Sequence, residues 1–226
     1  MQDINTYVDK VFYINMDKDV ERNDNIIRQF KKHGIWNYER ISGVVIDQIP
    51  DKHEMTCPDE DPIKSEKYIK SSFGCLNSHK KAIEIAVERN YSRICVFEDD
   101  ITLVEGFVEK FNQYITALDN ENPSHQIAYL GIDCDREKDL SQPLKKLRMH
   151  CYGAYAYILS NQDWVFKYVL QNIDYVVQEI DLLYNSMILQ NALSDCYVTV
   201  PNIVLHEYNY GSNINTDKNN ELHLHR

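Results

Sequence analysis

Short apolar runs alternate with amphipathic stretches along the first third of this chain. Val11–Asn15 is an apolar run typical of a buried strand. Ile26, Ile27 and Phe30 then recur at helical spacing, and Gly34 follows where the helix is expected to end. Tyr38–Val44 is expected to form a second strand. The order strand, helix, strand predicts an α/β domain that opens with two parallel strands.

The same two periodicities continue to about residue 205. We expect strands at 93–100, 126–133, 151–159 and 197–201, and helices at 76–87, 101–118, 162–171 and 182–193. No internal repeat or low-complexity linker interrupts the pattern, so residues 1–226 are predicted to form one domain. Residues 215–226 are predicted to be a flexible tail.

Two stretches lack periodicity. Residues 45–70 include a proline-bracketed acidic turn at 57–62, and residues 134–148 are polar and basic. Long irregular segments inside a compact domain often form lids or binding loops. For the acidic turn, a solvated surface loop is the favoured interpretation over a metal site.

Composition and charge restrict the partners of the chain. Its 226 residues are 43% hydrophobic and 26% charged, as in an ordinary globular protein. The net charge of −11 argues against nucleic acid or an anionic membrane as the main partner, since both attract a basic surface. Oligomer formation is left open.

Cysteine usage and the absence of targeting signals bear on location. The six cysteines (57, 75, 95, 134, 151 and 196) form no CxxC pair, and Cys75, Cys95 and Cys151 have the surroundings of buried free thiols. This usage favours a reducing, cytoplasm-like compartment. We expect neither a signal peptide nor a membrane-spanning segment, although the chain could be one domain of a larger protein.

An acidic cluster follows the most apolar strand. Residues 93–97 lead directly into Glu98, Asp99 and Asp100. Adjacent carboxylates repel one another unless a cation lies among them, and in α/β sheets ligands bind at the carboxyl ends of strands. The cluster is therefore a candidate site for Mg²⁺ or Mn²⁺, the alternative being a solvated acidic loop.

Other candidate residues lie at the ends of predicted elements. Asn77, Ser78 and His79 are expected near a helix N-terminus, where free N–H groups suit an anion or a sugar hydroxyl; capping is the structural alternative. Small residues beside tyrosines in 151–159 would let a ligand approach closely. Asp181 lies at the mouth of a helix and could simply cap it.

Four motifs in this order resemble glycosyltransferase family 25, which includes bacterial lipooligosaccharide galactosyltransferases and collagen hydroxylysine glycosyltransferases. They are Phe12-Tyr13-Ile14-Asn15-Met16-Asp17 with Arg22, then Gly74-Cys75-Leu76-Asn77-Ser78-His79, then Phe97-Glu98-Asp99-Asp100, and last Gly153-Ala154-Tyr155-Ala156-Tyr157. Two weaker points of resemblance are Asp181, in the place of the family's acid before a late helix, and residues 212–214 near the end of the chain. The resemblance covers residues 9–214. Met16 replaces the usual Leu of the family, and Asn77 a common Ser or Ala.

The resemblance implies a GT-A, Rossmann-like α/β fold with a mostly parallel central sheet flanked by helices. It also implies inverting transfer from a UDP-sugar, either UDP-glucose or UDP-galactose, with Mn²⁺ or Mg²⁺ on the diphosphate. Asp100 would be the main metal ligand, with Glu98 and His206 as further ligands and Asp99 in support. The donor would be held by residues from all four motifs (Ile14, Asn15, Met16, Arg22, Asn77, Ser78, His79, Glu98, Asp99, Gly153 and Tyr155).

An inverting transfer needs a base to take the proton from the acceptor hydroxyl. Asp181 is preferred to Asp133, which also ends a predicted strand. The acceptor, a hydroxylysine peptide or a glycan, has no sequence signature. The alternative functions are a metal-dependent hydrolase of nucleotide sugars or phosphoesters and a binding module without catalysis.

Overall fold

The computed structural model describes residues 3–49, 66–133, 144–147, 152–161, 164–176 and 179–207. Its central sheet has the strand order β2-β1-β3-β7-β5-β8-β6, and a separate two-stranded sheet pairs β4 with β9. The strands are Lys10–Asn15 (β1), Tyr38–Ser42 (β2), Arg93–Glu98 (β3), Ile101–Leu103 (β4), Ile127–Asp133 (β5), Leu144–Lys146 (β6), Tyr152–Ser160 (β7), Cys196–Thr199 (β8) and Val204–His206 (β9). The helices are Ile4–Tyr7 (α1), Val20–Lys32 (α2), Glu66–Glu88 (α3), Phe107–Glu121 (α4), Val165–Ile173 (α5) and Ile180–Leu189 (α6).

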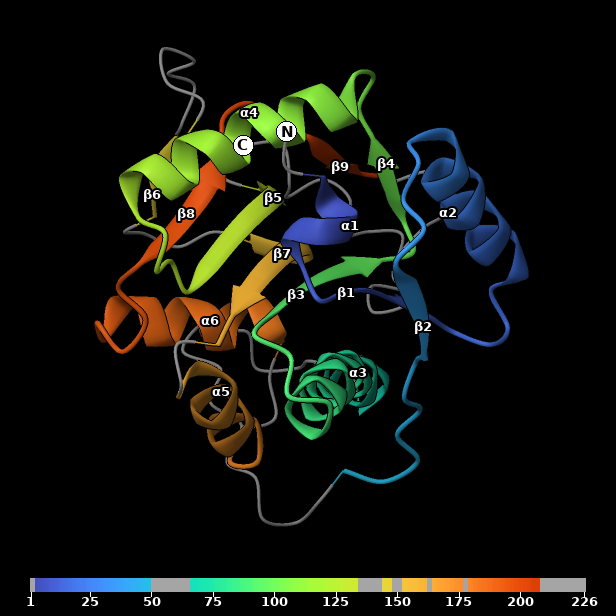
Figure 1. Cartoon of the computed structure of the whole chain (residues 1–226). Coiled ribbons are helices and arrows are strands. Elements are labelled where there is room, and N and C mark those ends of the chain that lie inside the picture. Colours follow the sequence, from blue (N-terminus) through green and yellow to red (C-terminus); the bar gives the residue numbers. More distant parts are fainter. Residues whose placement is uncertain are drawn as a thin grey trace.

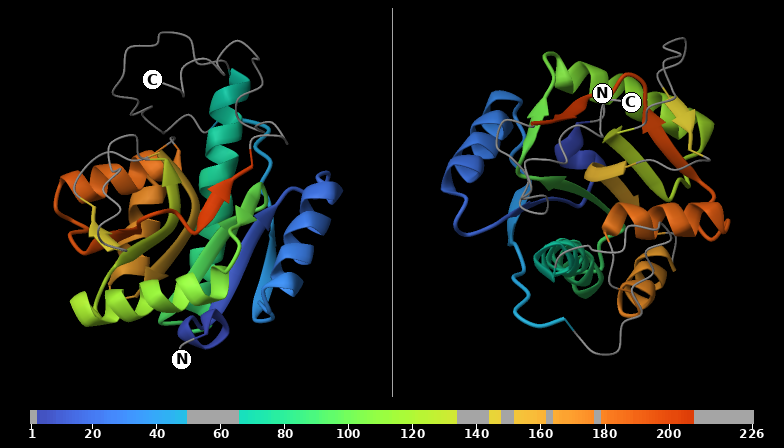
Figure 2. Two further views of the ribbon diagram at one scale, coloured as in Figure 1. Left: turned by 90° about the horizontal axis from the view of Figure 1, so that it is seen from above. Right: turned by 180° about the vertical axis from the view of Figure 1, so that it is seen from behind.

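Helices cover both faces of the central sheet (Figure 1). Side chains alternate between the faces: Phe12 and Val96 pack with α3, α5 and α6, whereas Val11 and Phe97 pack with α1, α2 and α4. The two clusters form hydrophobic cores on either side of the sheet. Figure 2 shows α3 running alongside the strands over most of their length.

Strand direction confirms the predicted α/β fold with a mostly parallel central sheet. β2, β1, β3, β5 and β8 run in one direction, and β7 and β6 run against them. β7 lies between β3 and β5 and is antiparallel to both, which its apolar sequence does not reveal. The carboxyl ends of β1, β3 and β5 therefore lie at the same edge of the sheet as the start of β7.

Three predicted elements differ from the structure. Helix α3 begins at Glu66 rather than near Leu76, so Asn77, Ser78 and His79 lie in its interior and offer no free N-terminal N–H groups. Residues 101–118 are not one helix, because β4 and a turn at Gly106 (φ 70°) precede α4. Part of the predicted loop 134–148 is strand β6, which pairs with β8.

Several sequence predictions concern residues outside the described ranges. These are most of the aperiodic stretch 45–70 with its acidic turn, residues 134–143 of the second loop, Cys151, residues 212–214 and the predicted tail. Among described residues, Cys95 is buried and Cys75 half-buried, and both are free thiols. None of the described helices is both long and apolar enough to cross a lipid bilayer.

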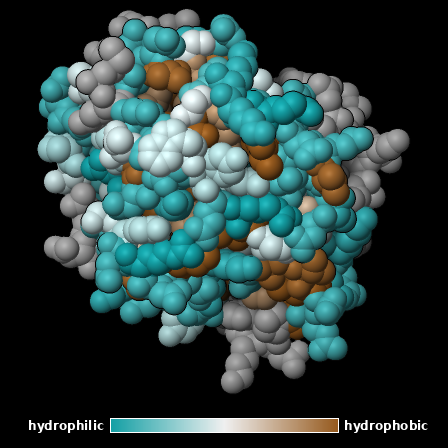
Figure 3. Space-filling model, turned by 45° about the vertical axis from the view of Figure 1, so that its right-hand side comes forward, coloured by the Kyte–Doolittle hydropathy of each residue, from teal (hydrophilic) through white to brown (hydrophobic). Residues whose placement is uncertain are grey.

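The face of the molecule shown in Figure 3 is mainly hydrophilic, and its hydrophobic side chains form small separate groups. Single exposed apolar residues are normal on protein surfaces, whereas broad apolar patches mark interfaces. The described part of this face therefore gives no sign of an extended apolar contact surface.

Candidate active site at the carboxyl edge of the sheet

The acidic cluster leaves β3 at the edge where β1 also ends. Asn15, the last residue of β1, donates from Nδ2 to Asp99 Oδ2 at 2.6 Å. Arg40 on β2 donates from Nε to Asn15 Oδ1 at 2.9 Å and so fixes the orientation of the amide. The parallel pairing of β2, β1 and β3 thus places a polar network beside Asp99.

Arg22 neutralises part of the cluster. Its Nη1 lies 3.1 Å from Asp99 Oδ1 and 3.1 Å from Asp100 Oδ2, and all three residues are buried. Burial raises the pKa of Asp99 to about 6, although the Asn15 and Arg22 hydrogen bonds oppose the rise. In this structure the Arg22 guanidinium lies between the two acids. It supplies the positive charge that two neighbouring buried carboxylates require.

Removing this guanidinium should strongly destabilise the protein. Breaking a buried ion pair by removing one partner costs about 3–5 kcal/mol, because the remaining charge stays buried without compensation. We therefore expect Arg22→Met to lower the free energy of unfolding, measured by urea denaturation in the presence of a chelator, by about this amount.

Arg89→Met provides the matched control, since the Arg89–Glu39 pair is exposed at the surface and should contribute much less. Equal stability of Arg22→Met and the wild type would contradict the described role of Arg22.

The small β4–β9 sheet brings His206 to the cluster from more than 100 positions away in the sequence. Ile101 pairs with His206, and the Glu207 N–H donates to the Asp100 carbonyl at 2.7 Å. His206 Nε2 then lies 3.6 Å from Asp100 Oδ2. Burial alone would lower the pKa of His206, but the hydrogen bond and charge of Asp100, with Glu98 and Asp133, raise it above the ordinary value.

Asp100 Oδ1 is buried and has no hydrogen-bond partner among the described residues. A buried carboxylate oxygen without a partner is costly unless a cation or water reaches it. Hard carboxylate oxygens suit Mg²⁺ and Mn²⁺, and imidazole suits Mn²⁺ tolerably. Asp100 and His206 therefore fit a divalent metal.

Both candidate bases lie beside Gly153 at the start of β7. The Gly153 N–H donates to Asp181 Oδ2 at 2.9 Å, and the Leu182 N–H donates to Asp181 Oδ1 at 2.8 Å. A Cβ on Gly153, whose φ is 80°, would lie 3.6 Å from Asp133 Oδ2. Burial raises the pKa of Asp181, and the backbone hydrogen bonds offset only part of this rise. Asp181 lies in the first turn of α6, whose N-cap residue is Glu179.

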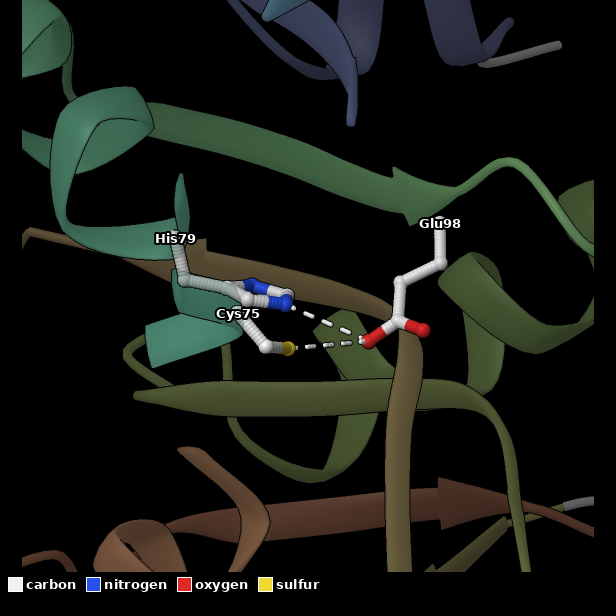
Figure 4. Close-up of side chains that lie close together, drawn as sticks. All are labelled: Cys75, His79 and Glu98. Carbon is white, nitrogen blue, oxygen red and sulfur yellow. Dashed lines mark hydrogen bonds and ion pairs between the residues drawn. The ribbon is translucent and has the colours of Figure 1, made fainter. Parts of the chain in front are cut away.

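Glu98 is the member of the acidic cluster that contacts α3. His79 Nε2 is 3.3 Å and Cys75 Sγ 3.9 Å from Glu98 Oε1 (Figure 4). Tyr157 OH lies 2.8 Å from His79 Nδ1 and holds the other side of the imidazole. Cys75 was not among the predicted site residues; its i, i+4 spacing from His79 was the available signal, and the late predicted start of α3 concealed it.

Not every predicted donor residue has its side chain directed toward this edge. Ser78 is buried, donates to the Gly74 carbonyl and accepts from the Val44 N–H at 2.8 Å. The Asn77 Nδ2 donates to the Phe73 carbonyl at 2.7 Å. These bonds give both side chains a structural function, in agreement with the structural alternative given for them above.

The remaining predicted donor residues line strand ends near the cluster. Ile14 is half-buried and pairs in register with Glu98, and Met16 follows β1, where its sulfur would clash with any side chain at Gly43. Tyr155 is buried with its ring 5.6 Å from the His206 ring. A Cβ on Gly131 would clash with the Val204 carbonyl oxygen and lie 2.6 Å from the Tyr155 ring, so that glycine makes room for the backbone of β9 and for the tyrosine.

The site thus has carboxylates from three elements at one edge of the sheet. Arg22 lies between Asp99 and Asp100, and His206 lies beside Asp100. The profile of glycosyltransferase family 25 (LPS biosynthesis protein) matches residues 8–184, and the chain belongs to this family.

Curated relatives are similar over part of their length. The chain is 25% identical over 134 residues to "Probable inactive glycosyltransferase 25 family member 3" of Bos taurus, covering 54% of this chain and 22% of the relative. It is 22% identical over 167 residues to human "Procollagen galactosyltransferase 2", covering 72% of this chain and 26% of the relative. The chain therefore spans about a quarter of the length of the curated relatives it matches.

Among solved structures, one similar chain is a glycosyltransferase involved in the glycosylation of the major capsid of PBCV-1. The two are 11% identical, with a TM-score of 0.49, over 90% of this chain and 94% of that one.

Proposed function

We propose that this protein is an inverting, metal-dependent glycosyltransferase that moves galactose or glucose from a UDP-sugar to an acceptor hydroxyl. The observation that carries the proposal is the buried Asp100 Oδ1, which lacks a hydrogen-bond partner among the described residues at the end of β3. In a chain of glycosyltransferase family 25, such an oxygen is suited to a cation that accompanies the donor diphosphate.

Asp100 and His206 would hold Mn²⁺ or Mg²⁺, with Glu98 turned toward the metal's waters or the ribose. When bound, the metal acts as a Lewis acid that offsets the charge of the departing diphosphate. Asp99, fixed by Asn15 and Arg22, keeps the turn in shape. The chain's own contribution is therefore an acidic cluster held in place before the donor arrives.

The nucleotide would lie along the ends of β1 and β3. Ile14 and Met16 flank the strand end, and Gly153 and Tyr155 approach it from β7. Arg22, which already bridges Asp99 and Asp100, lies close enough to the cluster to face a phosphate as well. His79, which contacts Glu98, would form the wall on the α3 side, whereas the Asn77 and Ser78 side chains are bonded to backbone groups and would support that wall from within.

The acceptor hydroxyl must lose a proton as its oxygen attacks the anomeric carbon. Asp181 is the proposed base, because burial raises its pKa and its oxygens are oriented by two backbone N–H groups. Asp133, on the other side of Gly153, is the alternative. A raised pKa brings a carboxylate closer to the strength that general-base catalysis needs.

The acceptor is proposed to be a hydroxylysine peptide or a glycan. The name of the human relative joins galactose with procollagen, and the family description names LPS biosynthesis. Two of the similar curated relatives have names that describe them as inactive, so turnover itself has to be measured.

We expect UDP release from UDP-galactose or UDP-glucose in the presence of Mn²⁺, increased at least tenfold by an acceptor. The measurement is a screen of both donors, with and without a collagen-type hydroxylysine peptide or a lactose-type acceptor. UDP release that no acceptor accelerates would favour a nucleotide-sugar hydrolase. Binding of UDP without any turnover would favour a binding module, and either result would contradict the proposal.

A further inference from the structure

Three potential ligand atoms for a transition metal converge between α3 and β3. Cys75 and His79 are one helical turn apart, so both side chains leave the same face of α3 and point to Glu98 (Figure 4). The thiol, imidazole and carboxylate atoms all lie within 4.8 Å of one another. This set contains a thiol, which the Asp100–His206 pair lacks.

The separations match those of zinc ligands. With ordinary Zn²⁺ bond lengths and tetrahedral angles, nitrogen and oxygen ligands lie about 3.4 Å apart and sulfur and oxygen ligands about 3.6 Å apart. Here His79 Nε2 is 3.3 Å and Cys75 Sγ is 3.9 Å from Glu98 Oε1. These two separations fit an ion bound by all three side chains, and the third, between the thiol and the imidazole, is no longer than 4.8 Å.

The surroundings favour a cation and keep the imidazole in place. Tyr157 OH lies 2.8 Å from His79 Nδ1, and the Tyr184 hydroxyl donates to Tyr157 at 3.3 Å. A partner on the second ring nitrogen is typical of metal-bound histidines. Burial, together with the charges of Glu98 and Asp181, raises the pKa of Cys75, so the thiol keeps its proton until a cation displaces it. The same carboxylates attract that cation.

Access and coordination number point to an exchangeable ion. His79 is fully buried and Cys75 half-buried, but 27% of the Glu98 side chain is exposed, so an ion can enter along the carboxylate. Three protein ligands leave one tetrahedral position for water. A thiolate and an imidazole select Zn²⁺ over Mg²⁺ and Mn²⁺, which prefer oxygen.

We propose that Cys75, His79 and Glu98 form a Zn²⁺ site separate from the metal position at Asp100 and His206. As the Sγ–Zn bond forms, the thiol proton passes to the buffer, and the neutral imidazole binds through Nε2 while Nδ1 faces Tyr157. The ion holds Glu98 against α3. Since the proposed function assigns Glu98 to the donor site, Zn²⁺ should inhibit sugar transfer; this last step rests on that function.

The test uses the full chain and two probes, Zn²⁺ with a chromogenic chelator as competitor and Co²⁺ absorption. The wild type should bind one equivalent of Zn²⁺ more than Cys75→Ser, and its Co²⁺ form should show a thiolate charge-transfer band that Cys75→Ser and His79→Asn lack. Cys95→Ala is the matched control, since Cys95 is buried in β3 away from this set and should leave both signals unchanged. Melting curves establish that each variant is folded.

Equal Zn²⁺ content in the wild type and Cys75→Ser, or a Co²⁺ spectrum without a thiolate band, would overturn the site. Asp100→Ala separates failure of the Zn²⁺ site from failure of the proposed function. This variant should lose turnover but still bind the extra equivalent of Zn²⁺. If transfer occurs, Zn²⁺ should lower the wild-type rate at least tenfold at saturating Mn²⁺ and lower that of Cys75→Ser by less than twofold. Equal inhibition of both would refute the competition through Glu98.

Discussion

Asp100→Ala is expected to reduce sugar transfer at least 1,000-fold at saturating Mn²⁺. The substitution removes the buried carboxylate whose Oδ1 lacks a hydrogen-bond partner among the described residues and which also faces His206. Lewis-acid stabilisation of a leaving diphosphate contributes several kcal/mol, and about 4 kcal/mol corresponds to this factor. The measurement is the rate of UDP release in the presence of acceptor.

Glu105→Ala is the control for this prediction, because Glu105 is an exposed acid paired with Lys32 on the surface and should leave the rate within twofold of the wild type. Since Asp100 also pairs with Arg22, folding of the variant must be verified by its melting curve. A folded Asp100→Ala protein with wild-type turnover would show that the acidic cluster has no part in the reaction.

Asp181→Asn is expected to lower kcat by a factor of about 100 to 10,000, the range that general-base catalysis contributes. The amide cannot accept the acceptor's proton, whereas the donor site at β1 and β3 is left intact. Affinity for UDP, measured by calorimetry, should therefore stay within about threefold of the wild type. Asp133→Asn should lose far less activity; the reverse order of effects would assign the base to Asp133.

The pH profile of kcat gives a second measure of this role. The base must be ionised, so activity falls as pH drops through the pKa of Asp181. Because burial raises that pKa, the acidic limb should lie above the ordinary aspartate value of 3.8. The limb should disappear from the residual activity of Asp181→Asn. A limb that persists unchanged would belong to another group.

The strands that position the site can be predicted from the sequence, because each is formed by a local run of apolar residues. Val11–Asn15 and the run before Glu98 are apolar, and both appear as buried strands whose carboxyl ends meet. Buried charges require partners, and Asp99 and Asp100 stay buried after this strand because Arg22 pairs with both of them. Membership of glycosyltransferase family 25, expected from four short motifs, is confirmed over residues 8–184.

Other features depend on contacts that no local pattern encodes. The antiparallel insertion of β7 between β3 and β5 is decided by the whole sheet, because parallel and antiparallel strands of similar apolar content look alike in sequence. The ion pairs of Arg22 are also not visible in the sequence pattern, because Arg22 lies in α2 and its partners Asp99 and Asp100 lie in the turn after β3.

The start of α3 at Glu66 could not be predicted for another reason, which is local. Residues 66–73 contain tyrosine, serine and lysine without a clear apolar stripe, so the periodic signal began only near Leu76. In the structure Asn77 and Ser78 lie in the interior of α3, and Cys75 and His79 are one helical turn apart on it. Helix boundaries are weak points of pattern analysis, and here one boundary changed the chemistry assigned to a motif.

Calorimetric titration of UDP into the wild-type protein, with Mn²⁺ and then with excess chelator, tests the central claim most directly. A cation held by Asp100 and His206 that contacts the diphosphate should make UDP bind at least tenfold more tightly with Mn²⁺ present, and Asp100→Ala should abolish this difference. Equal UDP affinity of the wild type with Mn²⁺ and with chelator would contradict the account.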